Sequence, residues 1–235
     1  MRRSHYRIDL LIDTYQPGRQ HERAVIVRRS CWSWHRPAAS LVDTHGNSRL
    51  MIFRETRLKG VFEIDLEPQQ DKRGLFARSY CWREFQAHGL NPQVAQCNVS
   101  YNRTRGTLRG MHYQTAPDAE AKLIRCARGA LYDVVVDIRE DSPTFRQWTA
   151  AELRAEAGTP SRMMYVPEGF AHGFLTLEDD TEVFYQMSGF YSPQAARGFR
   201  WNDPAFGVEW PEPVQVISDR DRTYPDFDGT RQQAS

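Results

Sequence analysis

The sequence has little that would suit a membrane, a nucleic acid or secretion. No apolar run approaches the roughly 18 residues that a membrane-spanning helix needs. Asp9, Asp13 and Pro17 interrupt the N-terminus before a signal-type apolar stretch can form. The 31 basic residues nearly balance the 30 acidic ones, so the total charge gives no reason to expect a nucleic acid or an anionic membrane surface as partner. We therefore expect a cytoplasmic protein that binds neither.

Signatures of several kinds of site are also missing. Cys31, Cys81, Cys97 and Cys126 are scattered without a CxxC pair, which favours reduced structural thiols over a zinc knot or a redox dithiol. The chain has no glycine-rich phosphate loop before a lysine, no dinucleotide fingerprint and no nucleophile elbow. These absences count against ATP chemistry, hydride transfer and serine hydrolysis.

The chain divides into two parts of unequal character. Its 235 residues, 40% of them hydrophobic, suit one domain with a sizeable core. Residues 1–50 hold nine of the basic residues, four of the acidic ones and no sustained strand or helical period. We interpret 1–50 as a weakly structured N-terminal extension, with Met51 as a possible true start, and 51–235 as the single domain. An arginine-rich tail that binds an anion is the alternative, but its basic residues are dispersed.

The sequence from Val61 onward predicts strands. Phe62, Ile64 and Leu66 alternate with acidic residues, as a half-buried strand requires. Six further strands are predicted at 122–127, 130–138, 148–153, 162–166, 172–177 and 181–188, the first two forming a hairpin around Arg128-Gly129. Many short, evenly spaced strands are typical of a sandwich, a jelly roll or a small barrel, so we predict an all-β fold.

One convincing helix is predicted before the later strands. Trp82 and Phe85 lie three residues apart within 82–88, and Gly89 is placed to stop the helix. The fold should therefore contain a few short helices beside its strands.

Two histidine segments are candidate sites. Arg109-Gly-Met-His112-Tyr-Gln is followed by Lys122 on an adjoining strand, so a guanidinium, an imidazole and an amine converge. In Pro167-Glu-Gly169-Phe-Ala-His172, a proline and a glycine turn the chain tightly into a strand that opens with histidine. This second segment matches the PxGxxH part of the cupin pattern.

A metal site is not expected, although many cupins hold one. Cupins often use an HxH pair, a glutamate and the later histidine, but here His112-Tyr-Gln114 replaces the pair. The third histidine of the domain, His88, ends the predicted helix, which makes a three-histidine site implausible. We expect His172 to support the site rather than bind a metal. A metal-dependent cupin oxygenase or isomerase is the alternative.

From about Gly60 to Phe227 the sequence resembles the dTDP-4-dehydrorhamnose 3,5-epimerase family. The matching segments run in order as Asp71-Lys-Arg73-Gly-Leu-Phe76, Gln96-Cys-Asn98-Val-Ser100, Leu108-Arg-Gly-Met-His-Tyr-Gln114, Lys122-Leu-Ile-Arg-Cys126, Val136-Asp-Ile-Arg139, Ser142-Pro-Thr-Phe145, Val166-Pro-Glu-Gly-Phe-Ala-His-Gly-Phe174, Tyr191-Ser-Pro193 and Trp201-Asn-Asp203-Pro. The resemblance implies a cupin-type jelly-roll β-sandwich or barrel that forms a homodimer and needs no metal or organic cofactor.

The activity that the resemblance implies is epimerisation of a nucleotide-linked sugar. Members of the family invert carbon 3, carbon 5 or both in a dTDP-4-keto-6-deoxyhexose, in the synthesis of deoxysugars and surface polysaccharides. His112 matches the general base, Asp221 its paired carboxylate and Tyr185 the proton donor on the opposite face. Lys122 fits the task of stabilising the enolate, because hydrogens beside a ketone are too weakly acidic for an unaided imidazole.

The register of one strand supports the tyrosine. Val183 and Met187 lie on the same side of the strand as Tyr185, so Tyr185 should point into the barrel. Without the resemblance, a buried core tyrosine would be the preferred interpretation. A sugar-binding cupin without turnover is a third alternative, against which the joint presence of the four catalytic candidates argues.

Other matching positions imply substrate contacts. Arg73 and Arg109 match residues that hold the diphosphate, where a guanidinium fork pairs well with phosphate oxygens. Surface ion pairing is the alternative for both arginines. The remaining matches to ligand-contacting positions are Phe76, Gln96, Asn98, His172 and Tyr191, and no role is assigned to Glu120.

The chain departs from the family pattern at two positions. Arg78 stands where the family usually has a glutamate that contacts the base, and Gln186 stands where a lysine commonly follows the tyrosine. The resemblance therefore leaves open the base, the sugar and which carbon centres are inverted.

Overall fold

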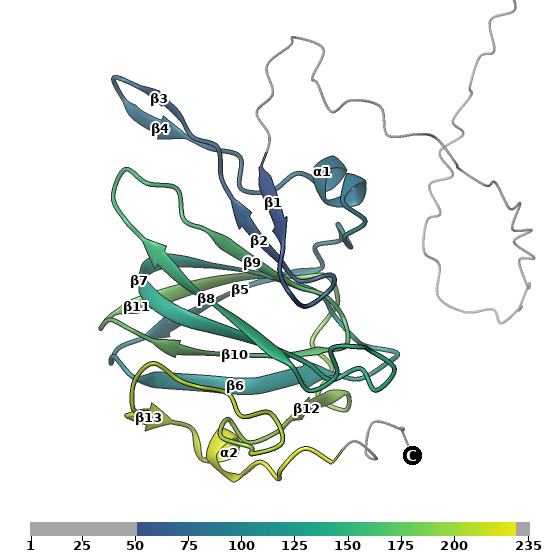
Figure 1. The fold of residues 1–235 in the computed structure, drawn as a ribbon. Coiled ribbons are helices and arrows are strands. Elements are labelled where there is room, and N and C mark those ends of the chain that lie inside the picture. The colour runs from purple at the N-terminus through teal and green to yellow at the C-terminus, as the bar shows by residue number, and fades with distance from the viewer. Residues whose placement is uncertain (1–50, 229–235) are drawn as a thin grey trace, which may run out of the picture. The chain divides into compact units, whose positions relative to one another are not determined.

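Strands are the main regular structure in residues 51–228, the part of the chain that the computed structural model describes (Figure 1). The predicted extension at 1–50 lies outside this range. The strands are β1 (Ile52–Glu55), β2 (Phe62–Asp65), β3 (Gln69–Asp71), β4 (Gly74–Phe76), β5 (Gln96–Asn102), β6 (Thr107–Gln114), β7 (Lys122–Asp137), β8 (Trp148–Ala155), β9 (Met163–Val166), β10 (Phe170–Thr176), β11 (Thr181–Met187), β12 (Ala196–Gly198) and β13 (Val216–Ile217). The helices are α1 (Trp82–Ala87) and α2 (Asp219–Thr223). The predicted all-β, cupin-type sandwich with short helices is confirmed.

Strand β7 joins two layers of sheet. In the first layer the order is β1-β2-β9-β7-β11-β5, and in the second it is β8-β7-β10-β6, with β12 and β13 both beside β6. Neighbouring strands are antiparallel except for β13, which runs parallel to β6. The two layers therefore share one strand, and side chains of both pack against each other between them.

The predicted hairpin around Arg128-Gly129 is wrong, because β7 continues through these residues. Arg128 pairs with Glu182 of β11, and Gly129 pairs with Ala155 of β8, so the strand changes partners at this point. Gly129 has φ +76°, and a Cβ there would lie 2.6 Å from Thr181 Oγ1. Glycine thus bends the strand from one layer to the other instead of ending it.

The second half of β7 is buried on both faces. Leu131 and Val135 face the core between the layers, where they pack with side chains such as Phe174 and Val183. Residues 134 and 136 belong to a separate core on the outer face of the second layer, which Phe199, Phe206 and Phe227 of the C-terminal segment cover. Burial on both faces explains the nearly continuous apolar sequence of this strand.

The predicted helix at 82–88 is confirmed as α1, and a third core lies around it. Phe85 packs there with Ile64, Leu90 and Met163. Among the described residues, no helix has the length and apolar character to cross a membrane.

Strands β3 and β4 form a separate two-stranded sheet whose side chains are exposed. Figure 1 shows this hairpin projecting from the domain at the end remote from α2. No strand was predicted there, because short polar strands that bury neither face leave no alternating apolar pattern.

Candidate active site

His112 of β6 contacts Asp221 of α2. The imidazole Nε2 lies 2.7 Å from Asp221 Oδ1, and the backbone N–H of Gly110 donates to Oδ2 of the same carboxylate at 3.3 Å. The imidazole is 40% exposed and the carboxylate 7%. A partly accessible imidazole is thus oriented by a nearly buried carboxylate.

The chain brings Asp221 to β6 through a short parallel strand. Val216 and Ile217 pair with Thr107 and Leu108, which aligns the C-terminal segment with β6. Helix α2 then begins after Ser218, whose side chain accepts from the Asp221 N–H at 3.1 Å. This N-cap fixes the turn that points Asp221 at His112.

The surroundings of Asp221 favour its charged form. Burial opposes ionisation, but the hydrogen bond and charge of His112, together with the Gly110 and Ser218 contacts, hold the pKa of Asp221 below its ordinary value of 3.8. The carboxylate is therefore ionised at neutral pH and can stabilise a protonated imidazole.

A bulge in β6 allows Arg109 and His112 to share one face. His172 of β10 pairs with His112, whereas Phe174, two residues later, pairs with Arg109, three residues earlier. The extra residue in β6 reverses the alternation that would put these two side chains on opposite faces. A Cβ at Gly110 would lie 2.6 Å from the Gly173 Cα, so the close approach of β6 and β10 at the bulge requires glycine.

His172 lies directly across the sheet from His112 and has its own carboxylate. Its Nε2 lies 2.7 Å from Asp133 Oδ1 of β7, and both side chains are almost fully buried. The other oxygen of Asp133, Oδ2, is buried without a hydrogen-bond partner among the described residues. The supporting role expected for His172 stays a prediction.

Tyr185 of β11 points into the space between the layers, as its register predicted. Val183 and Met187 are buried on the same face, and the Tyr185 ring contacts the His172 ring edge-on with centroids 6.4 Å apart. Burial, and secondarily the charge of Asp133, raise the pKa of Tyr185 well above its ordinary value, although Arg109 and a hydrogen bond with Ser100 act in the other direction. The phenol thus keeps its proton throughout the neutral range.

Lys122 lies in the same cavity wall as His112. The cavity has a volume of about 190 Å³, and its lining includes His112, Glu120, Lys122, Tyr191, Arg197 and Arg220. Lys122 Nζ is 3.1 Å from Glu120 Oε1. Tyr185 is not among the lining residues of this cavity and approaches the site from the side of His172 instead.

Three other expected ligand contacts gather around this part of the fold. Asn98 of β5 pairs with Tyr185 across the strands, and its Nδ2 lies 3.7 Å from Met187 Sδ. Gln96 Oε1 accepts from the Tyr191 N–H at 2.6 Å. Arg109 Nε donates to Asn102 Oδ1 at 2.7 Å, so the terminal N–H groups of its guanidinium can donate to a ligand.

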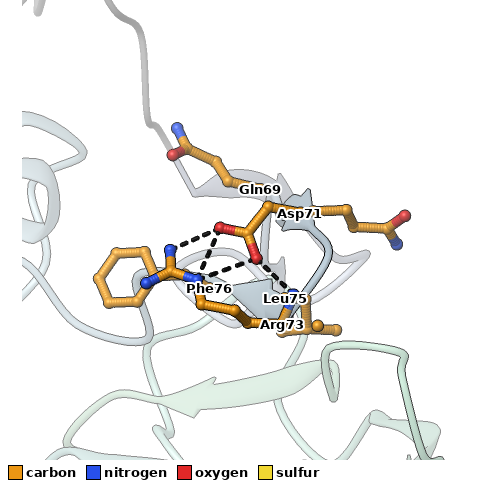
Figure 2. A pocket seen from close by; sticks show the side chains of 7 residues that line it. Gln69, Asp71, Arg73, Leu75 and Phe76 are labelled. Carbon is orange, nitrogen blue, oxygen red and sulfur yellow. Dashed lines mark hydrogen bonds and ion pairs between the residues drawn. The ribbon is translucent and has the colours of Figure 1, made fainter.

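Arg73 and Phe76, in contrast, lie on the projecting hairpin and form no part of that cavity wall. Figure 2 shows the Arg73 guanidinium turned towards Asp71 of the same hairpin, with Nη2 2.5 Å from Oδ2. Phe76 is 66% exposed. Within one chain, the structure does not bring these two residues to His112.

The two departures from the family pattern have different surroundings. The Arg78 guanidinium pairs with the buried Glu84 of α1, with Nη1 2.8 Å from Oε1. The other oxygen of Glu84 accepts from the Met51 backbone N–H at 2.8 Å. Gln186 follows Tyr185 in β11 and therefore lies on the opposite face of the strand.

Sequence reasoning missed several polar residues of the site. The sequence could have revealed Asp133, because an acidic residue within the apolar run of β7 must have a buried partner. Ser100 and Asn102 link Tyr185 to Arg109 through hydrogen bonds. Arg220 is hydrogen-bonded to Tyr191, a contact between segments that only the fold brings together.

No group of three or more histidine, cysteine or acidic side chains in residues 51–228 is arranged to hold a metal ion. His88 stacks on Phe53 with ring centroids 3.9 Å apart, beside α1 rather than with the other two histidines.

Comparisons with known proteins agree on one family. The family model described as dTDP-4-dehydrorhamnose 3,5-epimerase matches residues 55–229. The protein of that name from Sinorhizobium fredii is 42% identical over 176 residues, which cover 74% of this chain and 89% of the relative. The crystal structure of the Bacillus anthracis enzyme with TDP and PPi bound has a TM-score of 0.71 at 39% identity, covering 76% of this chain and 100% of that one. The Legionella pneumophila enzyme in complex with dTDP-4-keto-L-rhamnose has a TM-score of 0.70 at 31% identity, with coverage of 75% and 93%.

Proposed function

The chain belongs to the dTDP-4-dehydrorhamnose 3,5-epimerase family of carbohydrate epimerases, and from this premise we propose how its residues carry out the reaction. The substrate is a dTDP-linked 4-keto-6-deoxyhexose, and carbon 3, carbon 5 or both are inverted. The ligands named for the Bacillus anthracis and Legionella pneumophila structures support this class of substrate.

His112 is the general base. It is accessible from the cavity, and Asp221 lies 2.7 Å from its Nε2, where a carboxylate stabilises the imidazolium that forms after proton capture. This contact is the observation that carries the proposal, since it joins an accessible base that lines the cavity to a buried, ionised acid.

Lys122 stabilises the enolate. Removal of a hydrogen beside the ketone moves negative charge onto the carbon 4 oxygen, and an ammonium group in the wall of the His112 cavity counters that charge. Because the charge develops mainly in the transition state, the interaction accelerates the reaction rather than only tightening binding.

Tyr185 returns a proton to the other face of the sugar. Inversion requires such a donor, because a base that gives back its own proton restores the starting configuration. The raised pKa of Tyr185 keeps the phenol protonated, and its place on β11 puts it in the other sheet layer from His112 of β6. Ser100 and the His172–Asp133 pair hold the ring and its hydroxyl in place.

We also propose that the active unit is a homodimer in which the β3–β4 hairpin of one copy reaches the cavity of the other. Arg73 and Phe76 match ligand-contacting positions, yet both are exposed on a hairpin that projects from the domain. A second copy gives these side chains a site to enter.

Mixing two defective variants tests this arrangement. Subunits carrying Arg73→Ala and subunits carrying His112→Ala should be nearly inactive alone, but after unfolding and refolding together they should form hybrids with one intact site. No recovery of turnover would mean that the hairpin serves the cavity of its own chain.

Cytoplasmic location is part of the proposal. Cys81, Cys97 and Cys126 are free thiols in the described residues, which suits a reducing compartment. The role proposed for residues 1–50 is that of a dispensable extension to a single domain at 51–235.

The deciding experiment for the function is incubation with dTDP-4-keto-6-deoxyglucose in deuterated water. We expect deuterium to enter at carbon 3, carbon 5 or both, with the configuration at those carbons inverted, as NMR would show directly. Absence of exchange at both carbons over many turnover times would refute the proposed activity.

A further inference from the structure

Glu120 is buried beside Lys122 and has no part in the chemistry proposed above. Its side chain is 6% exposed and that of Lys122 13%, and Nζ lies 3.1 Å from Glu120 Oε1. The other carboxylate oxygen, Oε2, is buried and has no hydrogen-bond partner among the described residues. Burying a carboxylate with one unpaired oxygen costs free energy, so the arrangement needs a compensating reason.

The pair belongs to the wall of the His112 cavity. Glu120 lies two residues before Lys122, which is the first residue of β7. Both line the cavity that contains His112. Lys122 pairs with Met187 across the strands, two residues beyond Tyr185 on the same face.

The charges that face this pair are otherwise basic. The titratable side chains that line the cavity with this pair are His112, Tyr113, Tyr191, Arg197 of β12 and Arg220 of α2. On the other side of Lys122 lie Tyr80 and Tyr165. Among the residues that line this cavity, Glu120 is the one carboxylate. Without it, a half-buried ammonium would face two guanidinium groups, an arrangement that favours loss of the lysine proton.

We propose that Glu120 is a positioning residue that keeps Lys122 protonated and holds its ammonium group at the wall of the cavity. The inference rests on the enolate-stabilising role proposed for Lys122. Only the protonated amine can counter the charge on the carbon 4 oxygen, whereas a neutral amine cannot. An ammonium has three donors, and Glu120 occupies one of them through Oε1, so donors remain for the ketone oxygen.

The pH profile of turnover tests this role. Glu120→Gln keeps the shape of the side chain but removes its charge, so Lys122 should lose its proton at a lower pH. We expect the alkaline limb of kcat to move down by about one to two pH units, with turnover near the wild-type value at pH 6. Between the two alkaline limbs, the kcat of Glu120→Gln relative to that of the wild type should fall about tenfold for each pH unit.

Asp118→Asn is the matched control. Asp118 is exposed two residues before Glu120, so the substitution removes the same charge from the same segment without touching Lys122. Its profile should coincide with that of the wild type. A Glu120→Gln profile that also coincides, or one that is lowered equally at every pH, would overturn the inference.

Two further variants complete the test. Glu120→Asp keeps the charge on a shorter side chain, so it should lower kcat without moving the alkaline limb. A shifted limb would count against the inference. This variant can be tested even if Glu120→Gln does not fold. Lys122→Met separates the two proposals. Wild-type turnover by Lys122→Met would remove Lys122 from the mechanism, whereas an inactive Lys122→Met beside an unshifted Glu120→Gln would refute only the role of Glu120.

Discussion

His112 and His172 lie directly opposite each other on β6 and β10, and each imidazole contacts a different carboxylate. The pair at His112 is open to the cavity, because that imidazole is 40% exposed, whereas the imidazole of His172 is 7% exposed. Two similar pairs thus occupy neighbouring positions with different access to a ligand. This difference is why we assign proton abstraction to His112 and support of Tyr185 to His172.

Replacement of His112 by alanine should lower kcat by about 10² to 10⁴, the usual contribution of a general base. Because His112 and Asp221 act as one unit, adding Asp221→Asn to His112→Ala should cost little more. Turnover measured by NMR checks both expectations. His88→Ala, which changes an exposed histidine beside α1, is the control and should stay near wild type. Near-normal turnover by His112→Ala would end the assignment.

Tyr185→Phe should uncouple exchange from inversion. His112 can still remove a proton and return one to the same face of the sugar, so solvent deuterium should still enter. The product should keep its starting configuration. Proton NMR of the ketosugar in deuterated water distinguishes the two. Tyr101→Phe changes an exposed tyrosine of β5 and should invert normally. If Tyr185→Phe also inverts at the wild-type rate, Tyr185 is not the donor.

A protein truncated to begin at Met51 should fold, dimerise and keep its activity. The family match begins at residue 55, and the Met51 backbone nitrogen already donates to the buried Glu84 carboxylate. Truncation would turn that N–H into an ammonium, which forms a stronger, charge-assisted contact. Thermal unfolding, size-exclusion chromatography and turnover measure the outcome. Insolubility or weakened substrate binding would show that residues 1–50 are required.

Arg78→Met should destabilise the fold without changing the preferred base. Arg78 is the partner of the buried Glu84, so its loss leaves a carboxylate whose remaining contact among the described residues is the Met51 N–H. We expect the free energy of unfolding in urea to fall by about 1 to 3 kcal/mol, since the guanidinium itself is partly exposed. Turnover of dTDP-, UDP-, CDP- and GDP-linked ketosugars should keep its wild-type order. A changed order would mean that Arg78 reads the base.

Asp137 should make stability depend on pH in the acid range. Burial opposes its ionisation, but hydrogen bonds from Arg139, Ser142 and Thr144 outweigh this and lower its pKa from 3.8 to about 2. Because the folded-state pKa is depressed, the stabilisation is fully present above 3.8 and is lost as the pH falls towards 2. It amounts to roughly 2 kcal/mol.

Comparison with Asp137→Asn measures this contribution. The difference in free energy of unfolding between wild type and variant should be largest at pH 7 and should shrink below pH 4. The network that Asp137 anchors lies where β7 meets β10, since Asp137 pairs with Phe170 at the start of the strand that carries His172. A difference that does not vary with pH would show that the carboxylate charge contributes nothing.

Local patterns predicted helix α1 and several of the strands, but they did not predict β5 or β6. The alternation at Phe62 and Ile64, the apolar run of β10 and the inward register of Tyr185 all follow from periods that a single segment reveals. The hairpin predicted at Gly129 failed because a glycine that bends a strand and one that ends it look alike in sequence.

The sequence by itself determined the class of fold, the family and the list of groups able to do chemistry, because these depend on residue types and their order. Only the tertiary structure decided which of them meet. The bulge that turns Arg109 and His112 to one face, the 2.7 Å contact across 109 positions to Asp221, and the pairing of His172 with Asp133 arise from strands that are distant in sequence. Such contacts form because folding brings strands side by side to bury apolar surface and satisfy backbone hydrogen bonds, and no local pattern records the partner of a buried charge.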